Sequence, residues 1–154
     1  MPSIKFLNKK EKQEVLNKLN KQFGISELNG ILIRQGAEKI FLYQGSFSEQ
    51  EINKLESTIP IERVGIYFAK IQNNQIRLSI EATQILQEQI NKNIFELDDE
   101  QAEQWMMGQE LDVQTGKNDF LVMKYKNDFL GCGKASEKKI GNYIPKNRRL
   151  KARS

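Results

Sequence analysis

The side chains with the most evident binding chemistry are the cations near the C-terminal end of the sequence. Residues 134–154 contain eight basic residues and a single acidic one, Glu137, which gives this segment a net charge of +7. The basic residues are Lys134, Lys138, Lys139, Lys146, Arg148, Arg149, Lys151 and Arg153. Lysines attract phosphates whatever the nucleotide sequence, and arginines also fork onto a phosphate or stack on a base. The pattern therefore favours a polyanion, above all a nucleic acid, as the partner of this segment.

These cations flank a run of strand-forming residues. Residues 140–144 (IGNYI) lie between two groups of basic side chains. Disordered basic tails are poorer in apolar residues than this, so we predict a strand that holds the cations on a defined surface. Asn142 and Tyr143 would add a hydrogen bond or a stacked ring, as RNA recognition commonly uses. The alternative that the sequence leaves open is a disordered basic tail.

Residue types that most enzymes need are scarce. The 154 residues include no histidine and one cysteine, Cys132. This excludes a Ser-His-Asp triad, an imidazole base, a zinc ribbon and an intrachain disulfide. Seven acids crowd residues 96–112, but their spacing matches no calcium loop, and helix capping explains several of them. We therefore predict no enzyme, no metal and no cofactor; a pocket of Asp, Lys or Tyr groups stays the enzymatic alternative.

Two glycines, Gly131 and Gly133, alternate just before the basic segment. Their spacing matches neither of the glycine-rich phosphate loops, and no helix pattern follows them. Alternate glycines in a strand let a neighbouring strand or a ligand approach the backbone closely. We interpret the run as a packed strand in which Cys132 is a small buried residue.

Helix signals in the first half of the sequence are local and clear. A capping pattern at Asn8 and a stop at Gly24 enclose apolar residues at helical spacing, which predicts a first helix. Ser48 opens a second, shorter helix. A third helix is expected over residues 81–89.

Strand hairpins are predicted between these helices. One covers residues 30–43. The other covers residues 63–80 and turns at Asn73-Asn74, because asparagine tolerates the left-handed backbone that tight hairpins need. Residues 1–90 are therefore expected to form an α+β domain, an antiparallel sheet with flanking helices.

The second half, residues 91–154, has a different pattern. Acidic residues from Asp98 onward predict a short helix that ends near Gly108. Strands are expected over residues 94–97, 120–125, 129–135 and 140–144. Several short strands separated by turns indicate a small β-barrel. We expect this domain to pack on the first, with no flexible linker between them.

No apolar run approaches the length that spans a membrane, and the N-terminus becomes charged too early for a secretory signal. With one cysteine and no disulfide, these features lead us to expect a cytoplasmic protein with no membrane partner.

The C-terminal residues also resemble a known family. The run LGCGK at residues 130–134, followed by GNYIPKNRR at residues 141–149, resembles the PUA-like RNA-binding tail of the Sun-type rRNA cytosine methyltransferases. Residues 64–70 (VGIYFAK) and 76–82 (IRLSIEA) are similar to the junction between the pre-PUA and PUA domains of the Nip-type ribosome-biogenesis factors. The chain looks like an archaeal stand-alone protein of this kind.

This resemblance implies a pre-PUA-like domain over residues 1–90 and a PUA-like β-barrel that binds structured RNA over residues 91–154. Carried over position by position, it implies an RNA groove at Gly108, Lys134, Lys139, Asn142, Lys146, Arg148 and Arg149. The catalytic portion of the methyltransferases has no counterpart here, because the sequence lacks both a glycine-rich SAM-binding unit and a pair of cysteines. Any methylation would come from a separate protein.

The expected function is therefore non-enzymatic binding of rRNA or tRNA in ribosome biogenesis or RNA modification, with no DNA partner. Phosphates would be contacted by Lys138, Lys139, Lys146, Arg148, Arg149, Lys151 and Arg153, with Asn142 and Tyr143 on bases or sugars. The alternative is an adaptor that docks on an RNA methyltransferase or a ribosome-assembly factor. Its docking surface would lie within residues 1–90, which carry a basic cluster of their own at Lys5, Lys9, Lys10 and Lys12.

Overall fold

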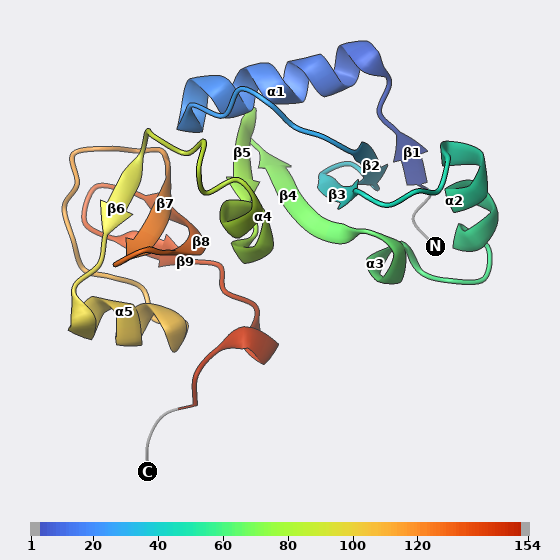
Figure 1. The fold of residues 1–154 in the computed structure, drawn as a ribbon. Helices are drawn as coiled ribbons and strands as arrows, with labels where there is room; N and C mark the ends of the chain where they lie inside the picture. The colour runs from blue at the N-terminus through green and yellow to red at the C-terminus, as the bar shows by residue number, and fades with distance from the viewer. Residues whose placement is uncertain (1–3, 152–154) are drawn as a thin grey trace.

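Two β-sheets lie side by side in the computed structural model, which describes residues 4–151 (Figure 1). The first sheet is an antiparallel meander in which each strand pairs with the next along the chain. Its strands are β1 (Ile4–Phe6), β2 (Ile31–Gln35), β3 (Lys39–Tyr43), β4 (Ile66–Gln72) and β5 (Gln75–Leu78). The two predicted hairpins are confirmed. Asn73 and Asn74 turn the second one with φ of 50° and 63°.

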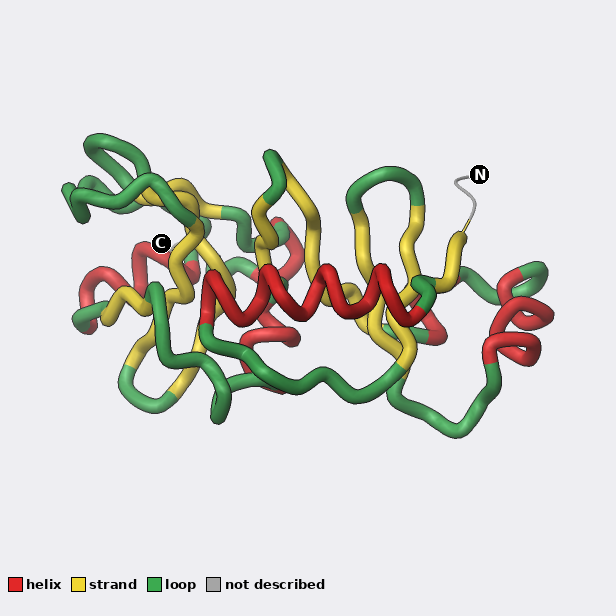
Figure 2. The backbone as a smooth tube through the Cα atoms, turned by 90° about the horizontal axis from the view of Figure 1, so that it is seen from above, coloured by secondary structure: helices red, strands yellow, loops and turns green. Residues whose placement is uncertain are grey.

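Helix α1 (Lys9–Phe23) has the predicted limits. The Asn8 side chain accepts a hydrogen bond from the Glu11 backbone, Glu11 bonds back, and Gly24 ends the helix with φ of 81°. Its apolar stripe packs on the first sheet, and its C-terminal end reaches the second (Figures 1 and 2). Helix α2 (Glu49–Glu56) begins with the predicted box at Ser48.

Two predicted boundaries in this half are wrong. The second hairpin begins at Ile66, because residues before it form the short helix α3 (Ile61–Val64) after Pro60. The helix expected over residues 81–89 is α4 (Ile80–Ile85), which Ser79 caps and which ends before the turns that follow.

The second sheet has the order β6-β7-β8-β9. Its strands are β6 (Ile94–Glu96), β7 (Phe120–Tyr125), β8 (Asp128–Ala135) and β9 (Ile140–Asn142). The predicted helix is α5 (Asp99–Met106), with Asp98 as its N-cap, and it connects β6 to β7 in parallel. A single 3₁₀ turn, η1 (Lys146–Arg148), follows β9.

The β-barrel predicted for the second half is not closed among the residues that the structure describes. Edge strand β6 pairs with β7 alone, and edge strand β9 pairs with β8 and with the isolated bridge residue Leu111. β9 stops at Asn142 because the chain then turns away, two residues before the predicted end. The mixed α/β class is confirmed, with an open four-stranded sheet in place of the barrel.

One hydrophobic core joins residues from both halves. It contains Leu19 and Phe23 of α1, Leu78 of β5, and Phe120 and Cys132 of the second sheet. A separate core behind the second sheet surrounds Trp105 of α5, which is fully buried. Surface that an isolated first half would expose is thus covered by β7 and β8. No helix within residues 4–151 is long and apolar enough to cross a membrane.

Candidate nucleic-acid interface

The path of the basic segment is fixed where β9 ends. The Asn142 side-chain amide donates to the backbone oxygens of Trp105 (2.8 Å) and Gln109 (2.9 Å). Its oxygen accepts from the Ile144 backbone at 2.8 Å. Both donor hydrogens of the amide are therefore used inside the fold, and its contact with RNA stays a prediction.

Arg149 packs over Gly108 and attaches the basic segment to the end of α5. Gly108 has φ of 86°, and a Cβ atom there would lie 2.4 Å from the Arg149 side chain. The Arg149 Nε donates to the Ile144 backbone oxygen at 2.9 Å, and the Leu150 backbone donates to Met106 at 2.8 Å. The structure thus brings together the predicted residues Gly108, Asn142 and Arg149. Arg149 holds the segment against α5, so its removal would disturb the backbone as well as the charge.

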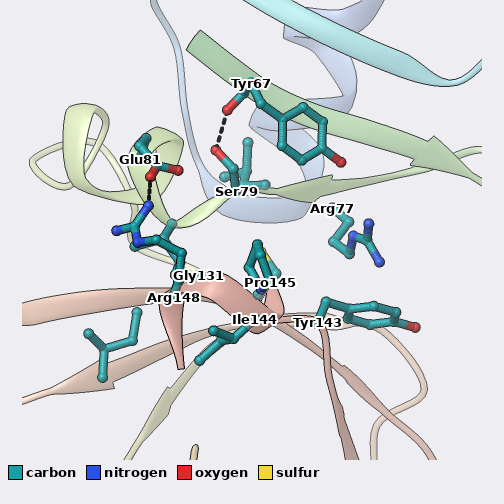
Figure 3. Close-up of a pocket in the computed structure, with 13 residues that line it drawn as sticks. Tyr67, Arg77, Ser79, Glu81, Gly131, Tyr143, Ile144, Pro145 and Arg148 are labelled. Carbon is teal, nitrogen blue, oxygen red and sulfur yellow. Dashed lines mark hydrogen bonds and ion pairs between the residues drawn. The ribbon is translucent and has the colours of Figure 1, made fainter. Parts of the chain in front are cut away.

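A narrow cleft of about 50 Å³ lies between the two halves. We call it the junction cleft. One wall comes from Tyr67 and from residues 77–81, and the other from residues 130–132, residues 143–145 and Arg148 (Figure 3). Arg148 closes one end of the cleft by an ion pair with Glu81, and Arg77 and Tyr143 lie side by side at the other end.

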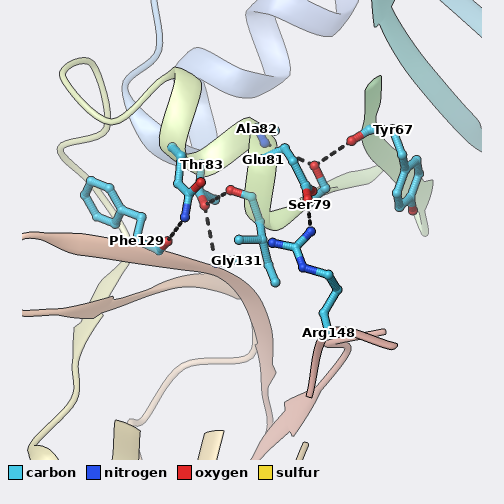
Figure 4. Close-up of polar contacts among 10 residues, drawn as sticks. Tyr67, Ser79, Glu81, Ala82, Thr83, Phe129, Gly131 and Arg148 are labelled. Atoms are coloured by element: carbon cyan, nitrogen blue, oxygen red, sulfur yellow. Dashed lines mark hydrogen bonds and ion pairs between the residues drawn. The ribbon is translucent and has the colours of Figure 1, made fainter. Parts of the chain in front are cut away.

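Polar contacts around α4 keep the junction cleft narrow (Figure 4). The Ser79 hydroxyl donates to the Tyr67 backbone at 2.6 Å and accepts from the first turn of α4. The Gly131 backbone donates to the buried Thr83 hydroxyl at 3.3 Å. The two walls are therefore bonded to each other, which fixes the position of the basic segment relative to β5.

Arg77 and Tyr143 form a cationic, aromatic surface at the open end of the cleft. The Arg77 guanidinium lies 4.0 Å from the centroid of the Tyr143 ring, which is 41% exposed. The Phe120 ring is 6.2 Å from Tyr143, and the Lys134 ammonium is 5.2 Å from Phe120. We call Arg77, Lys134 and Tyr143, together with Arg148 at the closed end of the cleft, the junction face.

Arg77 is a functional candidate that the sequence analysis missed. It alternates in β5 with the buried residues Ile76 and Leu78, so it points out of the core. That alternation was a sufficient signal for an outward cation. Its meeting with Tyr143 depends on how the two halves pack, which no local pattern records.

The remaining predicted cations differ in how free they are. Lys139 pairs with Glu110 at 3.1 Å. Lys138, Lys146 and Lys151 are exposed, and no carboxylate whose side chain the structure describes lies within ion-pair distance of them. Arg153 lies outside the described residues. The segment therefore presents several cations whose charge the folded chain does not neutralise.

A second surface lies on the other side of the basic segment, around α5. A groove of about 470 Å³ runs between α5 and residues 150–151, and we call it the α5 groove. It is lined by Asp99, Ala102, Glu103, Met106, Met107, Tyr125, Leu130, Leu150 and Lys151. Leu150 is 54% exposed there, and the Tyr125 hydroxyl donates to Asp99 at 2.6 Å. Apart from Lys151, this surface is apolar and acidic, which does not suit a phosphate backbone.

Cys132 has no catalytic environment. It is buried in β8, and burial raises the pKa of its thiol from 9.0 to about 12, although a backbone hydrogen bond at Leu78 and the Arg77 charge oppose the shift. The thiol is thus protonated at neutral pH and inert. Among the side chains that the structure describes, no group of three or more Cys, Asp and Glu is arranged to hold a metal ion.

Gly133 confirms the interpretation of close backbone packing. A Cβ atom there would lie 2.5 Å from the Ile140 side chain and 2.7 Å from the Trp105 ring. The alternate glycines of β8 therefore serve a neighbouring strand and helix, the first of the two options that the sequence left open.

Residues 92–150 match the family model described as the methyltransferase RsmF PUA domain. The predicted resemblance to the PUA-like region of rRNA methyltransferases is confirmed by this match. The model covers the second sheet, α5 and most of the basic segment.

Similar proteins named ribosomal RNA small subunit methyltransferase F occur in Vibrio species. The Vibrio cholerae protein is 23% identical over 139 residues, which are 89% of this chain and 28% of the relative. The Vibrio parahaemolyticus protein is 27% identical over 146 residues, which are 90% of this chain and 29% of the relative. The Vibrio campbellii protein is 32% identical over 91 residues, which are 54% of this chain and 19% of the relative. The chain spans less than a third of each relative's length. These relatives are bacterial and lend no support to the expected archaeal source.

Proposed function

We propose that this chain binds RNA, specifically rRNA or tRNA, as a non-enzymatic module in ribosome biogenesis or RNA modification. The observation that carries the proposal is the basic segment held on a folded surface. Lys138, Lys146 and Lys151 are exposed and pair with no described carboxylate, and Tyr143 of the same segment packs against Arg77. Unneutralised cations in one segment with a stackable ring are the chemistry that RNA recognition uses.

The comparisons support the RNA class of partner. The matched model is a PUA domain, and the relatives carry a name that refers to ribosomal RNA. The absence of histidine and the buried, protonated thiol of Cys132 support a role apart from catalysis as part of this proposal. The catalytic groups for methyl transfer would then lie outside these 154 residues. The cytoplasmic location stays part of this proposal.

The test is a titration of a labelled rRNA hairpin with the full chain, followed by fluorescence anisotropy. The variant K138Q/K146Q/K151Q removes three exposed charges, and K9Q/K10Q/K54Q removes three exposed charges elsewhere. We expect the first variant to bind about tenfold more weakly at about 0.1 M salt, because each lost phosphate contact also loses counterion release. The second should stay within about twofold. Equal losses in the two variants would remove the support for this surface.

The α5 groove favours a second candidate function, an adaptor that docks on an RNA methyltransferase or assembly factor, through residues 99–151 and not through residues 1–90, where the sequence placed the docking surface. Its exposed apolar side chains and flanking acids suit a basic, amphipathic segment of a protein. L150A/M107A should leave RNA affinity within about twofold and weaken capture of a purified methyltransferase partner. A loss of RNA affinity with no change in protein capture would argue against the adaptor.

A further inference from the structure

A polar groove adjoins the junction face along β5. It has a volume of about 400 Å³ and lies at the C-terminal end of α1, and we call it the α1 groove. Lys18 and Lys21 line it from α1, with Asn73, Asn74 and Gln75 from the β4–β5 hairpin. Its lining contains no apolar side chain, so it does not suit a hydrophobic peptide.

The base of the α1 groove is rigid. The Gln22 side chain donates to the Ile76 backbone oxygen at 3.0 Å and accepts from the Ile76 nitrogen at 2.8 Å. The Asn93 amide donates to the Gln22 backbone at 2.5 Å, and its oxygen accepts from Lys117 at 3.0 Å. These bonds tie α1, β5 and the approach to β6 together, so a ligand would meet a preformed surface.

The charge of the α1 groove favours an anion. Lys18 and Lys21 are three residues apart on one face of α1, and neither pairs with a carboxylate among the described side chains. Asp119 is the one acidic residue in the lining, and the Gln75 amide lies 3.5 Å from its carboxylate. Lysines beside the side-chain amides of Asn73 and Asn74 match a ribose-phosphate backbone and the polar edges of bases.

Strand β5 joins this groove to the junction face. Gln75 lines the groove and Arg77 stacks on Tyr143, and both alternate with buried residues, so they share one face of the strand. Residues two apart in a strand are separated by about 7 Å. Asp119 and Phe120, where β7 of the second sheet begins, make the same link, since Asp119 lines the groove and the Phe120 ring lies 6.2 Å from the Tyr143 ring.

We infer that the junction face and the α1 groove together bind one unpaired strand of RNA. A base stacks on the Arg77 guanidinium, which Tyr143 supports from the other side, and the adjoining phosphates lie at Lys18 and Lys21. A base inside a duplex has no free face for such stacking, which is why the strand must be unpaired there. This inference rests on the proposed function and specifies the form of RNA that the chain selects.

The experiment compares two labelled probes with the full chain, a 12-nucleotide unstructured RNA and a 12-base-pair RNA duplex, both sizes being about one binding site. R77A removes the stacking surface, R77K keeps the charge, and K18Q/K21Q removes the groove cations. K9Q/K10Q removes two exposed lysines at the other end of α1 and serves as the matched control. Circular dichroism confirms that each variant is folded.

We expect R77A to lower the affinity for the unpaired strand at least about fivefold. R77K should recover little of that affinity, because lysine has no planar group that stacks on a base. K18Q/K21Q should weaken it about three- to tenfold and reduce the log–log salt slope by about 1.4. Duplex binding should change by less than about twofold in R77A and R77K.

The inference is overturned if strand and duplex lose affinity equally, or if K18Q/K21Q behaves like K9Q/K10Q, while the wild type still binds RNA. That result would leave the proposed function intact. A wild-type chain that binds neither probe nor the rRNA hairpin would instead overturn the proposed function itself.

Discussion

The basic segment separates two surfaces of opposite character. On one side, the junction face offers Arg77, Lys134, Tyr143 and Arg148 over a cleft of about 50 Å³ whose walls are hydrogen-bonded. On the other, the α5 groove is wider, about 470 Å³, and is apolar with acidic edges. The net charge of the basic segment therefore does not by itself define which neighbouring surface binds an anion. Position in the fold decides which cations stand free and which lie beside acids.

The first prediction tests whether β8 stays packed against α4, so that the junction cleft is closed in solution. The raised pKa of Cys132, about 12 against 9.0, leaves about a thousandfold less thiolate than a free cysteine has near pH 8. We expect a disulfide reagent to react with the native protein at least about a thousandfold more slowly than with the protein in denaturant. Rapid native reaction would mean that β8 and α4 separate readily, and that the two surfaces are not distinct.

The same thiol gives a pH dependence with a defined sign. The folded state holds the proton more tightly, so this contribution to stability is complete below the unfolded pKa of 9.0 and is lost as pH rises toward about 12. The free energy of unfolding of the wild type minus that of C132A should therefore fall between about pH 8 and about pH 10.5. A difference that stays flat over that range would contradict the buried, protonated thiol.

A smaller effect should follow from adding a methyl group where β8 packs against β9 and α5, between the two surfaces. In G133A the new methyl group would collide with Ile140 and Trp105, which join β9 to α5. We expect a loss of about 1–3 kcal/mol in the free energy of unfolding, measured by urea denaturation. G141A is the matched control, because its Cβ would meet its nearest neighbour at 3.7 Å, an ordinary contact. A similar loss in both variants would contradict the collision, since the lower backbone entropy of an unfolded chain with alanine by itself favours the folded state.

The smallest predicted effect concerns the ion pair across the junction cleft. E81Q removes the carboxylate that holds Arg148, whose side chain is about half exposed. Because exposed ion pairs are weak, stability should change little, and RNA affinity should rise by at most about twofold as Arg148 becomes available. Weaker RNA binding in E81Q would show that Glu81 positions Arg148 productively.

Local patterns predicted the elements that depend on neighbours in the sequence. The caps at Asn8, Ser48 and Asp98 form within four residues, so three helix starts could be placed from the sequence. The hairpin at Asn73-Asn74 is equally local. Pairings between distant segments were not predicted, above all the parallel β6–β7 pair that leaves the sheet open.

The candidate site was predicted only in outline for the same reason. The density of basic residues identified the segment, but three of its members serve the fold in ways that their types did not reveal. Asn142 bonds to two backbone oxygens, Arg149 packs over Gly108, and Lys139 pairs with Glu110. Arg77 was missed because its significance comes from its contact with Tyr143. The two residues are far apart in the sequence and meet only through the packing of the two halves.

The salt dependence of RNA affinity tests the central claim most directly. Titration of the unpaired 12-nucleotide probe with the full chain, from about 50 to about 300 mM salt, reports how many phosphates the protein contacts. About six contacts, from Lys18, Lys21, Lys138, Lys146, Arg148 and Lys151, predict a log–log slope of about −4, and K138Q/K146Q/K151Q should reduce its magnitude by about 2. A slope near zero, or one that the three substitutions leave unchanged, would contradict RNA binding through the basic segment.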